Sequence, residues 1–334
     1  MSRAAAAALA VLLVTACTGG DRTAGPRIDT VLDTVDVDDA VGTDVVFYDL
    51  ATAPDGPPVA LVGAAGADQS WLVRLPSGAT TAIPAVEPDS ELVITDDGTP
   101  LIVGTALTPV GGAVLPLPLG GPPAAVLLAG DTLYLARDTR LAAVDAGTGA
   151  VRTTAAAPGP VTHLARAPDG GLTALVDQDG VVLLRLTPDL RPHGDPVELD
   201  PDGSGTPTAL RVTADGTVVA AMYVNEALDA GRLVTVVDGR VRTVADLEGT
   251  DDTALDLAVD PPGRVAYVVL SASYHPAELT AIDLATGERT ATVALCGGAG
   301  AFGAIAPSAD GSTLTVAGSC IDDGGPSTTA FVIG

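Results

Sequence analysis

Residues 207–224 read PTALRVTADGTVVAAMYV, in which two runs of small and branched apolar residues flank an Ala-Asp-Gly turn. This pattern predicts a β-hairpin, because glycine adopts positive φ and aspartate accepts hydrogen bonds from nearby backbone amides. The turn recurs along the chain, with glycines at Gly56, Gly98, Gly130, Gly170, Gly216, Gly263 and Gly311. Successive glycines lie 42, 32, 40, 46, 47 and 48 residues apart. That spacing is the period of a four-stranded propeller blade.

The chain is therefore predicted to be all-β, a single seven-bladed β-propeller of four-stranded antiparallel blades. We expect the first blade to use strands at 44–52, 58–63, 70–75 and 80–86, and later blades to begin near residues 91, 124, 160, 207, 253 and 301. The C-terminal part of the chain supplies only three strands for the seventh blade. Residues 28–37 (IDTVLDTVDV) alternate apolar and polar side chains and are predicted to close the ring as its fourth strand. Six or eight blades remain alternatives, because the 32-residue interval is short for a blade.

The N-terminus has the features of an export signal. Arg3 precedes an apolar run at 4–14, which is too short to span a bilayer permanently. Val14-Thr15-Ala16-Cys17 then resembles a bacterial lipobox, which implies cleavage before Cys17 and acylation of that residue, palmitate included. Two or more acyl chains hold a protein firmly on a membrane. An ordinary secretory signal with a coincidental cysteine is the alternative.

Three segments follow from this pattern. Residues 1–16 are predicted to be a lipoprotein signal peptide, residues 17–27 a lipidated cysteine with a flexible tether, and residues 28–334 the propeller. The predicted location is the extracytoplasmic face of the cell membrane. The rest of the sequence holds no apolar run of about 18 residues, so no transmembrane helix is expected.

The composition excludes several classes of function. The 334-residue chain has 16 basic and 42 acidic residues, and its formal charge is −26. It lacks lysine altogether, so Schiff-base chemistry and P-loop phosphate binding are excluded. Nucleic acid is a poor partner for such an acidic surface. Aromatic residues make up only 3% of the chain, so the core must be built from small branched side chains.

A second turn motif supplies a resemblance. Asp145-Ala-Gly-Thr-Gly149 and Asp283-Leu-Ala-Thr-Gly287 share the pattern Asp-x-x-Thr-Gly, and the second continues into a Thr/Val-rich strand. The segment 283–293 (DLATGERTATV) resembles the repeat of YVTN-type bacterial surface propellers, a WD-like architecture. The resemblance implies a propeller at the bacterial surface. The YVTN tetrapeptide itself is missing, and Tyr267-Val-Val-Leu270 is its nearest approximation.

Two cysteines remain besides Cys17. In the predicted topology Cys296 and Cys320 lie at the same end of one hairpin in the seventh blade. An exported protein meets oxidising conditions, so a disulfide is predicted.

The connections from strand D to the next strand A, and from B to C, share one end of a propeller, which is the usual ligand side. We name it the loop face. Many carboxylates are predicted there, together with the histidine of Tyr274-His275-Pro276. The predicted loop-face residues are Glu87, Asp89, Asp200, Asp202, Asn225, Glu226, Asp229, Glu248, Asp251, Asp252, Tyr274, His275, Asp322 and Asp323.

Cofactor and catalytic signals are weak. Asp200 and Asp202 offer oxygen ligands for Ca²⁺, but their segment lacks the Asp-x-Asp-x-Asp-Gly spacing and a terminal Glu. We expect no cofactor, with Ca²⁺ as the alternative. His275 and His163 are the candidate acid/base residues, and His163 is expected to line the central channel. Nucleophile and zinc motifs are missing from the sequence.

The sequence thus favours a membrane-anchored, extracytoplasmic propeller that acts as a monomeric binding or scaffold module at the bacterial cell envelope. Its expected partners are the membrane, through Cys17, and another envelope protein or a small ligand. The alternative is a lactonase-like or lyase-like propeller enzyme acting on a small molecule, with or without a divalent metal.

Overall fold

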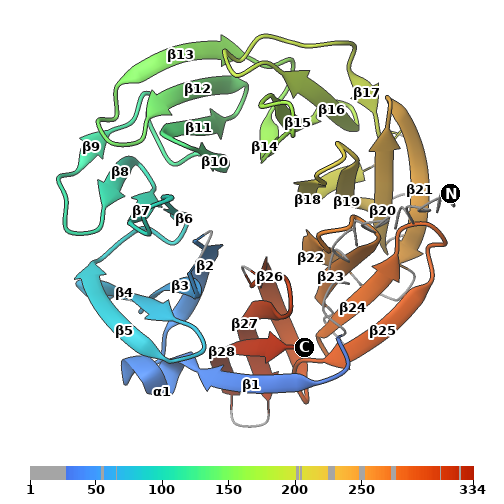
Figure 1. Cartoon of the computed structure of the whole chain (residues 1–334). Coiled ribbons are helices and arrows are strands. Elements are labelled where there is room, and N and C mark those ends of the chain that lie inside the picture. Colours follow the sequence, from blue (N-terminus) through green and yellow to red (C-terminus); the bar gives the residue numbers. More distant parts are fainter. Residues whose placement is uncertain are drawn as a thin grey trace, which may run out of the picture.

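The computed structural model describes residues 28–53, 56–64, 66–200, 203, 205–224, 230–247, 253–271, 276–308, 310–322 and 325–334. These residues form seven four-stranded antiparallel sheets that surround a central axis as blades (Figure 1). The prediction of a seven-bladed β-propeller is confirmed. Within the described ranges, no helix is long and apolar enough to cross a membrane.

Strands A to D of each blade run from the axis outward. Blade 1 contains β2 (Val46–Thr52), β3 (Pro58–Gly63), β4 (Gln69–Arg74) and β5 (Ala79–Pro84). Blade 2 contains β6 (Glu91–Ile94), β7 (Pro100–Val103), β8 (Ala106–Pro109) and β9 (Leu115–Pro116). Blade 3 contains β10 (Ala125–Ala129), β11 (Thr132–Arg137), β12 (Arg140–Asp145) and β13 (Val151–Ala156).

Blade 4 contains β14 (Val161–Arg166), β15 (Leu172–Asp177), β16 (Val181–Leu186) and β17 (Val197–Glu198). Blade 5 contains β18 (Gly205–Val212), β19 (Val218–Val224), β20 (Ala230–Val237) and β21 (Arg240–Leu247). Blade 6 contains β22 (Thr253–Val259), β23 (Val265–Ser271), β24 (Glu278–Asp283) and β25 (Arg289–Ala294). Blade 7 contains β26 (Ala299–Pro307), β27 (Leu314–Asp322), β28 (Gly325–Ile333) and, as its outer strand, β1 (Val31–Asp36).

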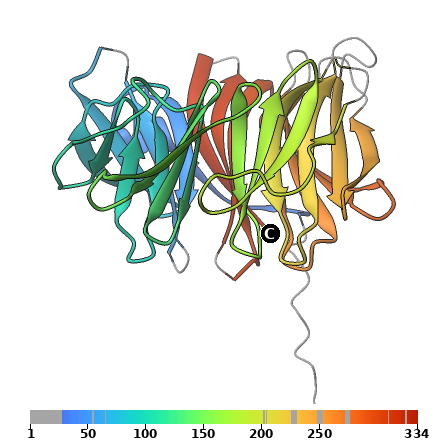
Figure 2. The same cartoon turned by 90° about the horizontal axis from the view of Figure 1, so that it is seen from above.

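The predicted blade starts all lie within two residues of the observed ones, and the short interval belongs to blade 2, whose outer strands are short. The ring has two ends, and Figure 2 shows the strands running between them. The A–B and C–D turns lie at one end, which we name the turn face. The B–C and D–A connections form the predicted loop face. Five of the seven A–B connections are five residues long, so the turn face is built from nearly uniform hairpins.

The N-terminal strand closes the ring as predicted. β1 pairs antiparallel with β28, with Val31 opposite Ile333 and Asp36 opposite Thr329. One helical turn, α1 (Val37–Val41), then leads into blade 1. Asp38 joins these parts, because one carboxylate oxygen accepts the Thr328 N–H at 2.8 Å and the other accepts the Val45 N–H at 2.7 Å.

The blades are held together by small apolar side chains, as the low aromatic content predicts. One cluster joins blades 3 and 4 through alanine, valine and leucine side chains, and another joins blades 5 and 6 in the same way. Phe302 heads the largest fully buried side chains, most of which are leucines. Each blade therefore depends on its neighbours to bury both of its faces.

The Asp-Gly turns adopt the predicted geometry. In the turn after β18, the Asp215 carboxylate accepts the Thr217 N–H at 3.0 Å and the Thr213 hydroxyl at 2.5 Å, and Gly216 has φ of +87°. Asp97 and Asp310 make the equivalent bonds in blades 2 and 7. A side chain at Gly216 would be strained by this positive φ.

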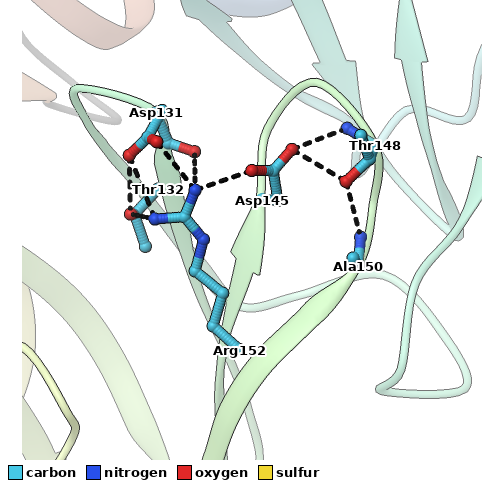
Figure 3. Close-up of polar contacts among 6 residues, drawn as sticks. All are labelled: Asp131, Thr132, Asp145, Thr148, Ala150 and Arg152. Atoms are coloured by element: carbon cyan, nitrogen blue, oxygen red, sulfur yellow. Dashed lines mark hydrogen bonds and ion pairs between the residues drawn. The ribbon is translucent and has the colours of Figure 1, made fainter.

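The Asp-x-x-Thr-Gly turns are also formed as predicted (Figure 3). Asp145 accepts the Thr148 N–H at 2.9 Å and its hydroxyl at 2.8 Å. In the same blade, Arg152 donates to Asp145 at 2.6 Å and to Asp131 at 2.8 Å, so one guanidinium joins the A–B turn to the C–D turn. The ion pairs of Arg152 with Asp131 and Asp145 are partly exposed, and we assign them a local role in holding these two turns.

Deleting residues 28–36 should lower the melting temperature by roughly 6–12 °C. The deletion removes the buried side chains of Ile28 and Val35, worth about 1.5–3 kcal/mol each, and a domain of this size loses about 2 °C per kcal/mol. Differential scanning calorimetry measures the change. Deleting residues 18–27 is the control and should leave the melting temperature unaltered. An equal melting temperature for both deletions would contradict closure by β1.

Candidate functional site

Five polar or charged side chains lie on the A strands that surround the central channel. In five blades the A–B pairing register shifts at one bulged residue of the A strand, which is β2, β14, β18, β22 or β26. The residue that follows the bulge has a polar or a small side chain in every case. Asp49, His163 and Asp256 each follow such a bulge. Glu91 in β6 and Arg211 in β18 complete the group, which we name the channel cluster.

Two aspartates of the cluster, in the blades on either side of blade 7, make the same contacts. Asp49 accepts the N–H of Leu50 at 2.7 Å and that of Leu92, in the next blade, at 2.6 Å. Asp256 accepts the N–H of Leu257 at 2.8 Å and that of Ile305, again in the next blade, at 3.1 Å. Each carboxylate therefore joins two neighbouring A strands.

The other members also join neighbouring blades. Arg211 in blade 5 donates to Asp256 in blade 6 at 2.8 Å. Glu91 in blade 2 accepts from the Val126 backbone in blade 3, and His163 in blade 4 bonds to the Thr208 backbone in blade 5. In the part of the chain that the structure describes, the cluster thus bridges five blade boundaries near the axis.

Burial changes the protonation of this cluster. The side chains are half-buried, with 16% of the Asp256 side chain exposed, and protein surrounds them on most sides. Loss of hydration raises the pKa of Asp49 to about 7, although the hydrogen bonds from the Leu92 and Leu50 amides act to lower it. Burial and the Asp49 charge raise the pKa of Glu91 to about 8. Burial also raises the pKa of Asp256, which Arg211 opposes.

His163 lies in the innermost strand of blade 4, β14, as a neutral ring. Burial and the nearby Arg211 charge lower its pKa to about 4, and its Nδ1 lies 3.0 Å from the Thr162 hydroxyl. The chemistry available near neutral pH is therefore proton exchange at Asp49 and Glu91 rather than at His163. Among the residues that the structure describes, no three His, Cys, Asp or Glu side chains are placed to hold a metal ion.

The loop face holds the second candidate site. Glu87 and Asp89 are exposed in the D–A connection before blade 2. Beside them is a hollow of about 250 Å³ between blades 1 and 2, lined by Glu87, Ser90, Thr105 and the side chain of Val114, which is 65% exposed. A carboxylate next to an exposed apolar side chain can receive a basic residue together with its aliphatic stem.

Asp200 differs from the expectation of an exposed loop-face residue. It is fully buried and accepts the Gly205 N–H at 2.5 Å, while its other carboxylate oxygen has no hydrogen-bond partner among the described residues. The bond from Gly205, at the start of β18, holds the aspartate side chain inward. Asp322 ends β27, and nothing is described of its side chain. The predictions that lie outside the described residues concern Cys17, Asp202, Asn225, Glu226, Asp229, Glu248, Asp251, Asp252, Tyr274, His275 and Asp323.

The disulfide prediction is confirmed. Cys296 and Cys320 are bonded, with Cα atoms 5.7 Å apart, and both are buried. The bond ties the connection before β26 to the loop-face end of β27. It therefore fixes the start of blade 7 at the side where the channel opens onto the loop face.

Sequence reasoning missed Asp49, Glu91, Arg211 and Asp256. A signal was present, since Asp49 and Asp256 each precede leucine within an A strand that is otherwise mainly apolar. Aligning the A strands with one another would have shown both carboxylates at one position. A charged residue in the innermost strand of a blade has the channel as its nearest polar surroundings.

The fold resembles many solved proteins. Their number is 1343 chains, and one of them is the structure titled hydrazine synthase of Kuenenia stuttgartiensis, with a TM-score of 0.67 and 15% sequence identity over 83% of this chain and 94% of that one. At this identity the likeness concerns the propeller fold. No protein-family profile and no curated protein sequence matches the chain, so the YVTN-type resemblance stays a prediction.

The channel cluster should make the protein less stable at pH 8.5 than at pH 6.5. Raised carboxyl pKa values mean that the folded state binds more protons than the unfolded state between pH about 4 and 8, so stability falls as pH rises through this window. His163 acts oppositely only below pH about 6.5, where the unfolded ring gains a proton. Thermal melts of the wild type and of Glu91→Gln measure the effect.

Glu91→Gln should flatten this pH dependence, because the amide does not ionise. Glu87→Gln, at an exposed site nearby, is the matched control and should retain the wild-type slope. A wild-type melting temperature that rises from pH 6.5 to 8.5 would contradict the assignment of Asp49 and Glu91 as buried, proton-holding groups.

Proposed function

We propose that this chain is a lipid-anchored, extracytoplasmic propeller that binds a basic partner protein at the bacterial cell envelope. The observation that carries the proposal is the position of the N-terminal strand. The Thr30 carbonyl accepts the Gly334 N–H at 3.2 Å, and Val31 pairs with Ile333, both at the turn face. An anchor at Cys17 would hold the ring by its turn face and leave the loop face directed away from the membrane.

The disulfide supports an extracytoplasmic location. Cys296 and Cys320 are bonded within blade 7, and such bonds persist in exported proteins but are rare where thiols are kept reduced. Together with the lipobox ending in Cys17, the bond favours export followed by anchoring.

The loop face supports a binding role for a basic partner. Its exposed described carboxylates include Asp44, Glu87, Asp89, Asp177 and Asp179. Its arginines are engaged: Arg232 pairs with Asp246 at 2.7 Å, and Arg140 donates to the Leu119 carbonyl at 2.7 Å. The face therefore presents uncompensated negative charge, which steers cationic partners and suits their recognition.

An enzyme acting on a small molecule is the second candidate, and the channel favours it. Asp49 and Glu91 hold protons near neutral pH, as general acids do. Both carboxyls are also engaged with the backbone of the next blade. A substrate would have to compete with those bonds, so we place the binding role first.

Cys17→Ser should move the protein from the membrane fraction to the soluble extracytoplasmic fraction, because the serine hydroxyl cannot form the thioether to the lipid. Fractionation with immunoblotting measures the shift. Cys296→Ser is the control, since it removes a thiol but keeps the anchor, and should leave the protein in the membrane fraction. Retention of Cys17→Ser on the membrane would contradict lipidation as the anchor.

Capture of cross-linked partners by the solubilised lipoprotein should recover a basic protein at low salt and lose it as salt rises, because surface charges are screened. The double variant Glu87→Gln/Asp89→Asn should recover about 5- to 30-fold less, which corresponds to one or two kcal/mol. Asp96→Asn/Asp189→Asn on the turn face carries the same change in charge and should recover the wild-type amount. Equal losses for both variants would contradict a loop-face binding site.

A further inference from the structure

We propose that the hollow between blades 1 and 2 on the loop face receives one arginine side chain of the basic partner. The inference rests on the proposed function and adds the residue that the partner presents and the contacts that select it. Blades 1 and 2 are neighbours in the ring (Figure 1), and we name the space of about 250 Å³ at their loop-face end the blade 1–2 hollow.

Two connections of the loop face border the blade 1–2 hollow. The D–A connection between β5 and β6 contributes Glu87 and Ser90, and the B–C connection between β7 and β8 contributes Gly104. Val86 and Ile102 add apolar side chains, and both belong to the core shared by these two blades. The hollow is therefore polar on one side and continuous with the apolar core on the other.

Ser90 is the buried polar residue of the hollow. Only 4% of its surface is exposed, it lines the hollow, and its hydroxyl makes no hydrogen bond to any residue that the structure describes. Buried polar groups usually have a partner, and leaving one without a partner costs free energy. The Ser90 hydroxyl is therefore open to a bond with a group that enters the hollow.

Gly104 leaves room beside this hydroxyl. A Cβ atom at Gly104 would lie 2.8 Å from Ser90 Oγ and 3.8 Å from Glu87 Oε2, so both oxygens border the space where a side chain is missing. Gly104 does not have the positive φ of the turn glycines, so the local backbone does not itself require glycine. What glycine provides at this position is access to both oxygens.

The Glu87 carboxylate is not neutralised by its surroundings. It is exposed, it forms no ion pair with a described residue, and the lining of the hollow contains no basic side chain. Asp68 adds an exposed carboxylate nearby, since its carbonyl accepts the N–H of Ala85, another lining residue, at 3.2 Å. The hollow therefore attracts a cation.

The two oxygens select a guanidinium group among the cations of proteins. Arginine ends in a planar fork of N–H donors, so it can donate two bonds to the Glu87 carboxylate and a further bond to the Ser90 hydroxyl. Lysine ends in a compact, strongly hydrated ammonium, which pairs with the carboxylate as a point charge. The apolar side chains of the lining, with that of Val114 exposed at the rim, can cover the aliphatic stem of arginine.

The size of the hollow favours one side chain over a whole small molecule. Pockets that hold drug-sized ligands have volumes of roughly 300–1,000 Å³, and the blade 1–2 hollow, at about 250 Å³, lies below that range. A protein that docks on the loop face can place a single residue in such a space. The hollow therefore fits the binding role better than the alternative role of an enzyme.

A titration with short peptides, followed through the NMR signals of the backbone amides, tests the proposal and reports weak binding. The probes are acetyl-Gly-Arg-Gly-amide, the same peptide with lysine in place of arginine, and the same peptide with citrulline, which has nearly the shape of arginine but no charge. The protein is the Cys17→Ser chain, so lipidation plays no part in the result.

We expect the arginine peptide to shift the amide signals of Ser90 and Gly104. It should bind about 3- to 10-fold more tightly than the lysine peptide, which is the factor that one further hydrogen bond supplies, and the citrulline peptide should cause no shift. Ser90→Ala should weaken binding of the arginine peptide by about the same factor. The melting temperature of Ser90→Ala should not fall, because the hydroxyl has no described partner to lose.

Gly104→Ala should abolish binding of the arginine peptide, because its methyl group fills the space between the two oxygens. Gly147→Ala is the matched control, since a Cβ at this exposed turn position would make only an ordinary contact of 3.6 Å with Asp145 Oδ1, and it should bind as the wild type does. Equal binding of the arginine and lysine peptides, wild-type binding by Gly104→Ala, or no shift at Ser90 and Gly104 would overturn the proposal.

Failure of this inference differs from failure of the proposed function. If the basic partner binds elsewhere on the loop face, Gly104→Ala will capture it as well as the wild type does, and the peptide titration will show no shift. If the protein has no basic partner, capture will recover none, whereas the titration will still report binding of the arginine peptide in the hollow.

Discussion

The structure depends on the need of every blade to cover two apolar faces at once. Alanine, valine and leucine side chains from adjacent blades form the shared clusters, so a missing neighbour would expose a full sheet face to water. The ring must therefore close, and β1 closes it on β28. Because closure brings both ends of the folded chain to the turn face, it also decides the end from which an N-terminal anchor would hold the ring.

The same closure explains the channel cluster. Seven A strands converge on the axis, where their inner edges leave backbone amides in need of partners, and bulges interrupt the pairing of five of them. Asp49 and Asp256 satisfy amides of the next blade, and Arg211 balances Asp256. The raised pKa values of Asp49 and Glu91 are thus a consequence of joining blades with carboxylates in a poorly hydrated space. A perturbed pKa is evidence of catalysis only where the group can reach a substrate. The carboxyls of Asp49 and Glu91 instead accept hydrogen bonds from the backbone of the next blade.

Much of the fold was predictable, because the residues of an Asp-Gly turn largely determine its backbone geometry. Asp215 and Asp283 accept the backbone hydrogen bonds that their turn motifs imply. Cys296 and Cys320 form a disulfide because the strand order places them at one end of a hairpin. The channel cluster was not predictable in the same way. Alternation along a strand predicts which residues share a face of the sheet. One bulged residue reverses that alternation for the rest of the strand. Asp49 faces the axis because the β2–β3 pairing register shifts just before it. Asp200 shows the converse error, a turn aspartate that faces inward.

The two ends of the ring differ in how much variation their connections allow. Five A–B connections have the same length, since a tight hairpin leaves little choice of geometry, and together they form a level surface. The B–C connections range from two residues between β7 and β8 to six between β23 and β24, and a hollow opens between blades 1 and 2 on that side. An uneven end with exposed carboxylates suits a shaped, basic partner. Loop geometry and charge thus both favour the loop face as the binding side of the ring.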